Sequence, residues 1–467
     1  MRDLRTNLAW DVLLDLSAPA DAPLHERLKR ALRREIRHGR IGLGSALPPS
    51  RKLAQDLGCS RWVVNEAYSQ LVAEGYLEAR VGSATRVRWS GDELSAHPTV
   101  AAADRSVLRF DLTPGLPDLR AFPRRQWADA VRTHALRAQV SELGYQAPEG
   151  HRVLRQLLAE YMRRARGTVA SDADITLSTS VTDGVRRVCH GLLARGIHVM
   201  GCEDPGWWRL REVVRSTGMR IVPMPTDAGG MRVDVLAEHP EVRAVLTTPA
   251  HQFPRGTVLA ADRRAALLRW ACNVDGVILE DDYDAEFRYD RRPVGTLQGM
   301  DPSRVILFKS LSKMLSPALG IGWIVAPPAW SEALRGSDVP AALPPTLDQL
   351  AFASLLESGA YERHLRRSRQ RYRIRRDALV HALAKHLPGW EISGAAAGLH
   401  LVVTLPPATE AQAVVRAAAA RSVQVAHLGD YFIGDSDEHG LVVGYGNLAD
   451  TAVEPAVTRL ATAVRST

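Results

Sequence analysis

The chain has 467 residues, of which 46% are hydrophobic and 24% are charged, and its net charge is +8. This length exceeds what one ordinary hydrophobic core needs and predicts two or three domains. No apolar run approaches the roughly 20 residues that a membrane span requires. Asp11 and Asp15 interrupt the apolar stretch near the N-terminus, so no signal peptide is expected and the protein should stay in the cytoplasm.

The cysteines give no sign of a metal site or a disulfide framework. There are four, and none of them forms a CxxC pair: Cys59, Cys189, Cys202 and Cys272. Reduced and mostly buried thiols are therefore expected, and no metal site is predicted.

The positive charge is concentrated at the start of the chain. Residues 1–90 carry 15 lysines and arginines against 10 acidic residues, an excess of five in the first fifth of the chain. The remaining 377 residues carry only +3 of the total of +8. Local basicity of this kind favours a nucleic-acid phosphate backbone as a partner.

Residues 23–88 show the pattern of a winged helix-turn-helix. Leu24, Leu28, Leu32 and Ile36 recur at helical spacing and predict a first helix. Ser50 and Ser60 are typical N-caps and predict helices over residues 50–57 and 61–74, separated by Gly58. Two short strands, 76–81 and 85–88, follow with a turn at Gly82. We therefore predict a DNA-binding domain over residues 1–88 and an exposed linker over 89–108.

In such a domain the N-terminal residues of the later helix meet the base edges in the major groove. Arg61 can pair with guanine and Asn65 with adenine, whereas Arg51 starts the preceding helix and should reach phosphate or base. The predicted DNA contacts are Arg51, Ser60, Arg61, Asn65 and Gly82 in the wing.

This stretch resembles the GntR family of regulators. The resemblance rests on Leu47-Pro-Pro-Ser-Arg51, Leu57-Gly58, Ser60-Arg61, Glu74-Gly-Tyr76 and the Gly82 wing. It implies a double-stranded DNA operator as partner. Trp62 occupies a position where small polar residues are more usual in the family.

From residue 109 to 467, apolar strand-like runs alternate with helical stretches. The runs begin at Ile197, Arg220, Ala244, Val277 and Val305. Alternation of this kind predicts an α/β domain with a mostly parallel sheet covered on both faces.

Two strand ends in this region carry groups suited to pyridoxal 5'-phosphate (PLP). After the run 305–308 come Ser310, Ser312 and Lys313, a lysine beside hydroxyls that could form a Schiff base next to a phosphate. The run 277–280 ends at Asp281, with Tyr283 two residues later. In open α/β sheets, ligands bind beyond the carboxyl ends of the strands.

Together these motifs resemble the fold-type I aminotransferases, and the whole chain resembles the MocR/GabR-like subgroup of GntR regulators. Further matches are Asp111–Asp118, Glu203-Asp-Pro-Gly206 and Thr248–Pro254. The resemblance implies that Lys313 forms the Schiff base, Asp281 pairs with the pyridine nitrogen and Tyr283 approaches the ring hydroxyl. It further implies the following roles: ring stacking for Trp207; phosphate contacts for Thr182, Ser310 and Ser312; contacts or ordering for His251 and Gln252; and an effector carboxylate contact for Arg209. A homodimer is implied as well.

The chain departs from the family in the phosphate-binding part of the site. Gly320 stands where the family has an arginine, Lys309 replaces a glycine, and Thr179-Ser-Val-Thr182 replaces Ser-Gly-Ala-Gln. Arginine–phosphate pairs are among the stronger hydrogen bonds. The paired change leads to the hypothesis that Lys309 supplies the lost cation.

A second departure concerns catalysis. Aminotransferases hold the substrate carboxylate with a late arginine near residues 438–444, where this chain has none and places His439. This absence argues against efficient transamination, although a half-reaction remains open. The sequence therefore predicts a regulator controlled by PLP or by an amine or amino-acid effector. Two alternatives stay open: a working aminotransferase with an accessory DNA-binding domain, and a regulator whose C-terminal domain has lost PLP and serves dimerisation or another ligand.

Overall fold

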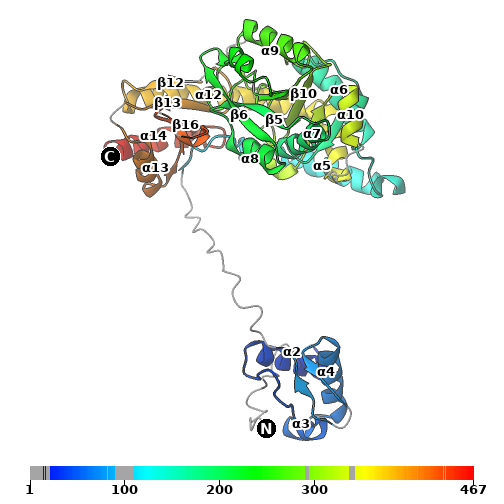
Figure 1. Ribbon diagram of the computed structural model, residues 1–467. Helices are drawn as coiled ribbons and strands as arrows, with labels where there is room; N and C mark the ends of the chain where they lie inside the picture. Colours follow the sequence, from blue (N-terminus) through cyan, green and yellow to red (C-terminus); the bar gives the residue numbers. More distant parts are fainter. Residues whose placement is uncertain are drawn as a thin grey trace. The chain divides into compact units, whose positions relative to one another are not determined.

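The computed structural model describes residues 14, 16, 22–80, 83–89, 110–289, 294–335, 342–394, 396–406, 409–434, 436 and 438–466. The chain forms two compact units, Met1–Arg105 and Ser106–Thr467 (Figure 1). The predicted linker lies, apart from Trp89, outside the described residues.

The N-terminal unit is a small helical domain with a two-stranded wing. Its elements are α2 (Leu24–Arg37), α3 (Ser50–Asp56), α4 (Arg61–Ala73), β1 (Leu77–Glu78) and β2 (Arg86–Val87). The apolar positions of α2 are buried against α4 in one core, which also includes Leu77 and Val87, an antiparallel pair between the two strands. Each strand is only two residues long, shorter than predicted. The element order is the predicted winged helix-turn-helix, although the N-cap of α3 is Pro49 and not Ser50 as predicted.

The C-terminal unit contains one large sheet and a smaller antiparallel one. The large sheet has the strand order β4-β11-β10-β9-β8-β5-β6-β7, and the smaller sheet has the order β12-β13-β16-β15. The strands of the large sheet are β4 (Ile175–Ser178), β5 (Val199–Asp204), β6 (Arg220–Asp227), β7 (Gly230–Met231), β8 (Ala244–Thr247), β9 (Val277–Asp281), β10 (Val305–Ser310) and β11 (Gly322–Val325). Neighbours from β10 through β6 run parallel, whereas β11 and β7 are antiparallel to their partners. The predicted α/β class is confirmed.

The other strands and the helices complete this unit. The strands are β3 (Phe110–Asp111), which pairs with β14 (Val423–Gln424), and β12 (Glu391–Ser393), β13 (His400–Thr404), β15 (Ala426–His427) and β16 (Gly440–Gly444). The helices are α5 (Arg124–Arg137), α6 (Arg152–Arg166), α7 (Val181–Ala194), α8 (Trp208–Ser216), α9 (Ala261–Asn273), α10 (Pro328–Arg335), α11 (Thr346–Glu357), α12 (Ala360–His386), α13 (Ala411–Ala420) and α14 (Val453–Val464). Among the described residues, no helix combines the length and the apolar character that crossing a bilayer demands.

Successive side chains of the central strands point alternately to the two faces of the large sheet, so the hydrophobic core is divided between these faces. Ile306 and Phe308 of β10 share an apolar cluster with α7, α8 and α10. Val305 and Leu307 pack in two other clusters, which contain α9 and α6, respectively. Because successive side chains of a strand point to opposite faces, each residue of β10 is committed to one side. The parallel strands end together, so the residues that follow them gather at one edge of the sheet.

Candidate cofactor pocket and DNA-reading surface

A pocket of about 460 Å³ lies at the carboxyl ends of β5, β8, β9 and β10, beside the N-terminus of α7. The residues predicted from the sequence that line it are Thr182, Trp207, Arg209, Asp281, Tyr283, Ser310, Ser312 and Lys313. They come from four separate segments of the chain, which the parallel sheet brings to a single edge.

Lys313 lies three residues beyond β10 and is half-buried in the lining of this pocket. Its Nζ is 5.7 Å from the centroid of the Trp207 ring. Burial lowers the pKa of the Lys313 amine, and Arg209 acts in the same direction, whereas Asp281 and Asp284 oppose the shift. A lowered pKa increases the fraction of neutral amine, which is the nucleophilic form. Gly115 approaches the amine closely, because a Cβ at this position would lie 2.9 Å from Nζ.

Asp281 ends β9 with a buried and incompletely satisfied carboxylate. No described group forms a hydrogen bond with its Oδ1. Burial, followed by repulsion from Asp282, raises the pKa of Asp281 to about 7. A protonated pyridine nitrogen would supply both the missing donor and a compensating positive charge. The site chemistry therefore fits the ring of PLP.

The pH dependence of stability should reveal this carboxylate. The pKa of Asp281 is higher in the folded chain than in the unfolded chain. The protonated carboxyl therefore stabilises the fold fully at pH values below the unfolded-state pKa, and this stabilisation is lost as the pH rises toward 7. We expect Asp281→Asn and the wild type to have similar stability at pH 4 in the absence of PLP. At pH 8 the variant should be more stable by on the order of 4 kcal/mol, since the pKa rises from 3.8 to about 7 and one pKa unit corresponds to about 1.4 kcal/mol.

Hydrogen exchange of β9 peptides at the two pH values measures this difference. An equal difference between the variant and the wild type at pH 4 and pH 8 would contradict the burial of an ionisable Asp281.

The Tyr283 hydroxyl contacts a buried histidine–aspartate pair, His251 and Asp284. The Tyr283 hydroxyl lies 2.8 Å from Nδ1 of His251, and the same nitrogen lies 3.0 Å from Oδ1 of Asp284. His251 and Gln252, which were predicted to contact or order the cofactor, do not line the pocket. Gln252 donates to the backbone carbonyls of Pro205 and Phe253 and so braces the loop. Both side chains therefore order the site from behind.

The N-terminus of α7 forms a cup of hydroxyl groups. Ser180 is its N-cap, and its Oγ accepts from the Asp183 N–H and lies 2.8 Å from Oγ1 of Thr182. Ser310 and Ser312 face the same pocket. Free N–H groups at a helix N-terminus together with hydroxyls suit an anion such as a phosphate group.

The hypothesis that Lys309 provides the cation of this cup is wrong. Its Nζ is fully buried and lies 3.0 Å from Oδ2 of Asp282 and 2.8 Å from Oε1 of Glu286. Lys309 alternates with Phe308 and Ser310 along β10, so its side chain leaves the sheet on the face opposite the cup. Gly320 has a φ of 57°, in the left-handed region, and also lies outside the pocket lining.

The predicted DNA contacts gather at the N-termini of α3 and α4. Arg51, Ser60, Arg61 and Asn65 are all exposed, and Nε of Arg61 donates to Oγ of Ser50. Ser60 accepts from the Val63 N–H and thereby caps α4. Gly82 of the predicted wing contact lies outside the described residues.

Trp62 is 61% exposed on the same helix and packs edge-on against His25 at 5.3 Å between ring centroids. A large exposed aromatic ring at this end of α4 is available for contact with a thymine methyl group or a sugar.

Comparison with known proteins agrees with both units. Residues 24–87 match the model for bacterial regulatory proteins of the gntR family, and residues 116–432 match the model for class I and II aminotransferases. The chain is 32% identical to a probable rhizopine catabolism regulatory protein, MocR, from Rhizobium meliloti, over 97% of this chain and 96% of the relative. The chain belongs to the MocR/GabR-like group of gntR-family transcription regulators.

A second relative of the same group supports this assignment. The pyridoxine biosynthesis regulator PdxR of Corynebacterium glutamicum is 30% identical over 94% of this chain and 95% of its own length. Among solved structures, an archaeal alanine:glyoxylate aminotransferase superposes with a TM-score of 0.70 at 24% identity, over 76% of this chain and 91% of that protein. At that identity the likeness shows the fold of the C-terminal unit.

His400 and Glu203 are among the polar residues of this regulator's pocket that were not predicted as site residues. His400 opens β13 and lines the pocket, with Nε2 donating to the Pro254 carbonyl. Burial lowers its pKa to about 4, so the ring is neutral. Glu203, within a motif quoted for the resemblance, accepts hydrogen bonds from Thr247 and Thr248. A polar residue at the start of the apolar run 400–403 was the available signal for His400, whereas His439 lies exposed outside the pocket lining.

Proposed function

We propose that this regulator binds operator DNA in the cytoplasm under the control of PLP held at Lys313. The observation that carries the proposal is that one pocket contains both the Lys313 amine and the buried Oδ1 of Asp281, which has no hydrogen-bond partner among the described residues. These two groups match the two reactive positions of PLP, its ring nitrogen and its aldehyde. The hydroxyl cup at α7 matches the phosphate group.

Each pocket residue has a defined task in this proposal. Lys313 provides the amine that attaches the cofactor, and Asp281 holds the ring nitrogen in its protonated form. Trp207 packs against the ring, and Tyr283, oriented by His251, approaches the ring oxygen. The phosphate contacts are the hydroxyls of Thr182, Ser310 and Ser312. When bound, PLP supplies an aldehyde that reacts with amines, which allows an amine or amino acid to act as effector.

Arg209 is the candidate partner of an effector carboxylate. It lines the pocket from the first turn of α8, and its charge acts on Lys313. No described carboxylate forms an ion pair with it, so its guanidinium is available to an anion. Bidentate pairing with carboxylate is the geometry that arginine favours.

We further propose that the regulator is a homodimer. Exposed apolar side chains gather at the end of α5 and in the segment after it, at Leu136, Val140, Leu143 and Tyr145, which are 63–107% exposed. Apolar patches of this kind mark interaction surfaces. Helix-turn-helix proteins commonly bind two DNA half-sites as dimers, and two copies of this chain would provide one DNA-binding domain for each half-site. An effector then controls DNA binding if it binds two arrangements of the dimer with different affinity.

The proposal is tested by selecting binding sites from a random DNA duplex library with the full chain. We expect a two-fold symmetric sequence to be enriched and its affinity to change when PLP is added to the wild type, with no change for Lys313→Ala. Failure to enrich any sequence would refute operator binding. Enrichment with the same affinity at every PLP concentration would refute control by PLP.

Arg61→Ala should weaken binding to the selected site and relax its base preference. Loss of one bidentate arginine–base pair costs about 1–3 kcal/mol of discrimination. Arg30→Ala is the matched control. Arg30 is 55% exposed on α2 in the same unit, and its replacement by alanine removes the same charge. Fluorescence anisotropy at fixed salt measures both variants. An equal loss in both variants would mean that Arg61 contributes only charge.

A further inference from the structure

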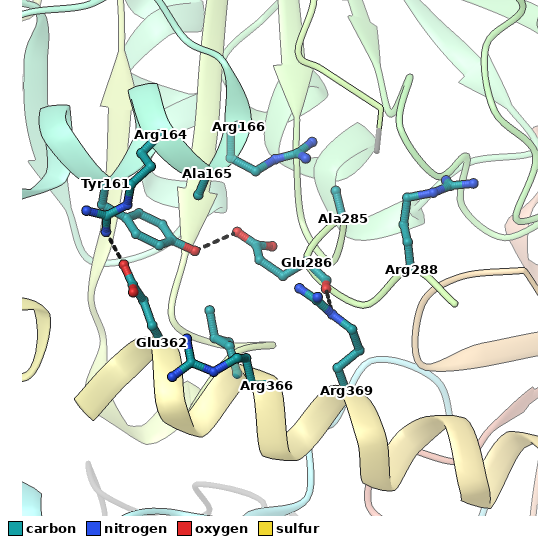
Figure 2. Close-up of a pocket in the computed structure, with 11 residues that line it drawn as sticks. Tyr161, Arg164, Ala165, Arg166, Ala285, Glu286, Arg288, Glu362, Arg366 and Arg369 are labelled. Atoms are coloured by element: carbon teal, nitrogen blue, oxygen red, sulfur yellow. Dashed lines mark hydrogen bonds and ion pairs between the residues drawn. The ribbon is translucent and has the colours of Figure 1, made fainter. Parts of the chain in front are cut away.

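A second hollow, separate from the cofactor pocket, encloses about 350 Å³ between the C-terminal end of α6, the first half of α12 and the segment that follows β9 (Figure 2). Five arginines line it: Arg164, Arg166, Arg288, Arg366 and Arg369. Only two carboxylates accompany them, those of Glu286 and Glu362. The volume is that of a small-molecule site.

The floor of the hollow, which Arg166 and Glu286 form, belongs to a buried and electrically balanced group. Arg166, 6% exposed, holds Asp282 through Nε at 2.7 Å, and Lys309 bridges Asp282 and Glu286. The Tyr161 hydroxyl donates to Glu286 at 3.3 Å. Two cations thus offset two carboxylates. The buried floor therefore cancels none of the charge at the rim.

The rim retains uncompensated positive charge. Arg164 is paired with Glu362 across the opening, as Figure 2 shows. Arg369 donates from Nε to the Glu286 carbonyl at 2.7 Å, which aims its guanidinium along the wall. Within the described part of the chain, no carboxylate forms an ion pair with Arg366 or Arg369. Both side chains project from α12 toward the hollow (Figure 2).

We propose that this hollow binds a small organic phosphate. A phosphate monoester carries a charge of about −1.5 to −2 at neutral pH, which matches the two unpaired arginines, Arg366 and Arg369. Their planar guanidinium groups present paired N–H donors to phosphate oxygens. The hydrogen bond to the Glu286 carbonyl holds Arg369 in place before a ligand arrives. The site is independent of PLP binding at Lys313, since it lies on the face of the sheet that Lys309, not Ser310, faces.

Calorimetric titration of the full chain with glycerol 3-phosphate tests the proposal, in the presence of saturating PLP so that the hydroxyl cup at α7 is not the site measured. We expect the double variant Arg366→Ala/Arg369→Ala to bind at least tenfold more weakly than the wild type, while Arg367→Ala binds normally. Arg367 is the matched control, because it is exposed on the same helix but does not line the hollow.

Three results would overturn the proposal. They are equal binding by the wild type and the double variant, an equal loss in Arg367→Ala, or succinate binding as tightly as the phosphate ester. If PLP itself fails to bind, the proposed function fails, yet the comparison between the wild type and the double variant still decides this site.

Discussion

Replacing Lys313 with alanine is expected to abolish covalent attachment of PLP to this regulator. Lys313 is the one lysine that lines the described cofactor pocket, and burial lowers the pKa of its amine. The visible absorbance that PLP acquires on condensing with a protein amine should appear in the wild type and be absent from the variant. Borohydride reduction followed by peptide mass spectrometry should place the label on Lys313.

The control for this experiment is Lys385→Ala. Lys385 is 57% exposed and pairs with Glu454 on the surface, so its loss should leave the absorbance unchanged. A label on another lysine, or retained absorbance in Lys313→Ala, would contradict the proposed site. If the wild type and Lys385→Ala both lack this absorbance, the result would favour the alternative in which the C-terminal unit serves dimerisation or binds another ligand.

Replacing Lys309 with methionine should destabilise the C-terminal unit without removing PLP. The Lys309 amine is fully buried and bridges Asp282 and Glu286. Removing one partner of a buried ion pair costs about 3–5 kcal/mol, because the other charges remain buried without it. Hydrogen exchange of peptides from β9 and β10, measured on the full chain, reports this loss directly.

Lys385→Met provides the comparison, since exposed ion pairs contribute at most about 1 kcal/mol. PLP affinity, measured at a temperature where Lys309→Met is folded, should match that of the wild type within a few fold. A large loss of PLP affinity with unchanged hydrogen exchange would restore Lys309 as a phosphate ligand.

Much of this molecule was predictable from the chain alone. The helical spacing from Leu24 to Ile36 and the cap at Ser60 encode local structure, and α2, α3 and α4 begin within one residue of the expected positions. The predicted cap at Ser50 was wrong, because Pro49 is the N-cap of α3 and Ser50 is its first helical residue. Lys313 and Asp281 were found because each lies just beyond an apolar run. The carboxyl ends of parallel strands meet at one edge, so such residues converge wherever the fold is an open α/β sheet.

The direction of single side chains was harder to predict than their place along the chain. Lys309 and Ser310 are adjacent, and motif matching assigned both to the phosphate cup. Strand alternation separates them onto opposite faces, and this rule could have excluded one of the two. Which face held the cup depended on the side of β10 that α7 covers, and that became visible only in the folded chain.

Tertiary structure alone assembled the remaining features. His400 reaches the pocket from the smaller sheet, more than 80 residues after Lys313, because β13 begins beside the loop that carries His251 and Pro254. The arginine-lined hollow draws on α6 and α12, about 200 residues apart in sequence. Such groupings depend on long-range packing, which leaves no periodic signal in the sequence. Local spacing thus encoded the elements and their ends, whereas the packing of α12 and β13 decided which distant side chains share a site.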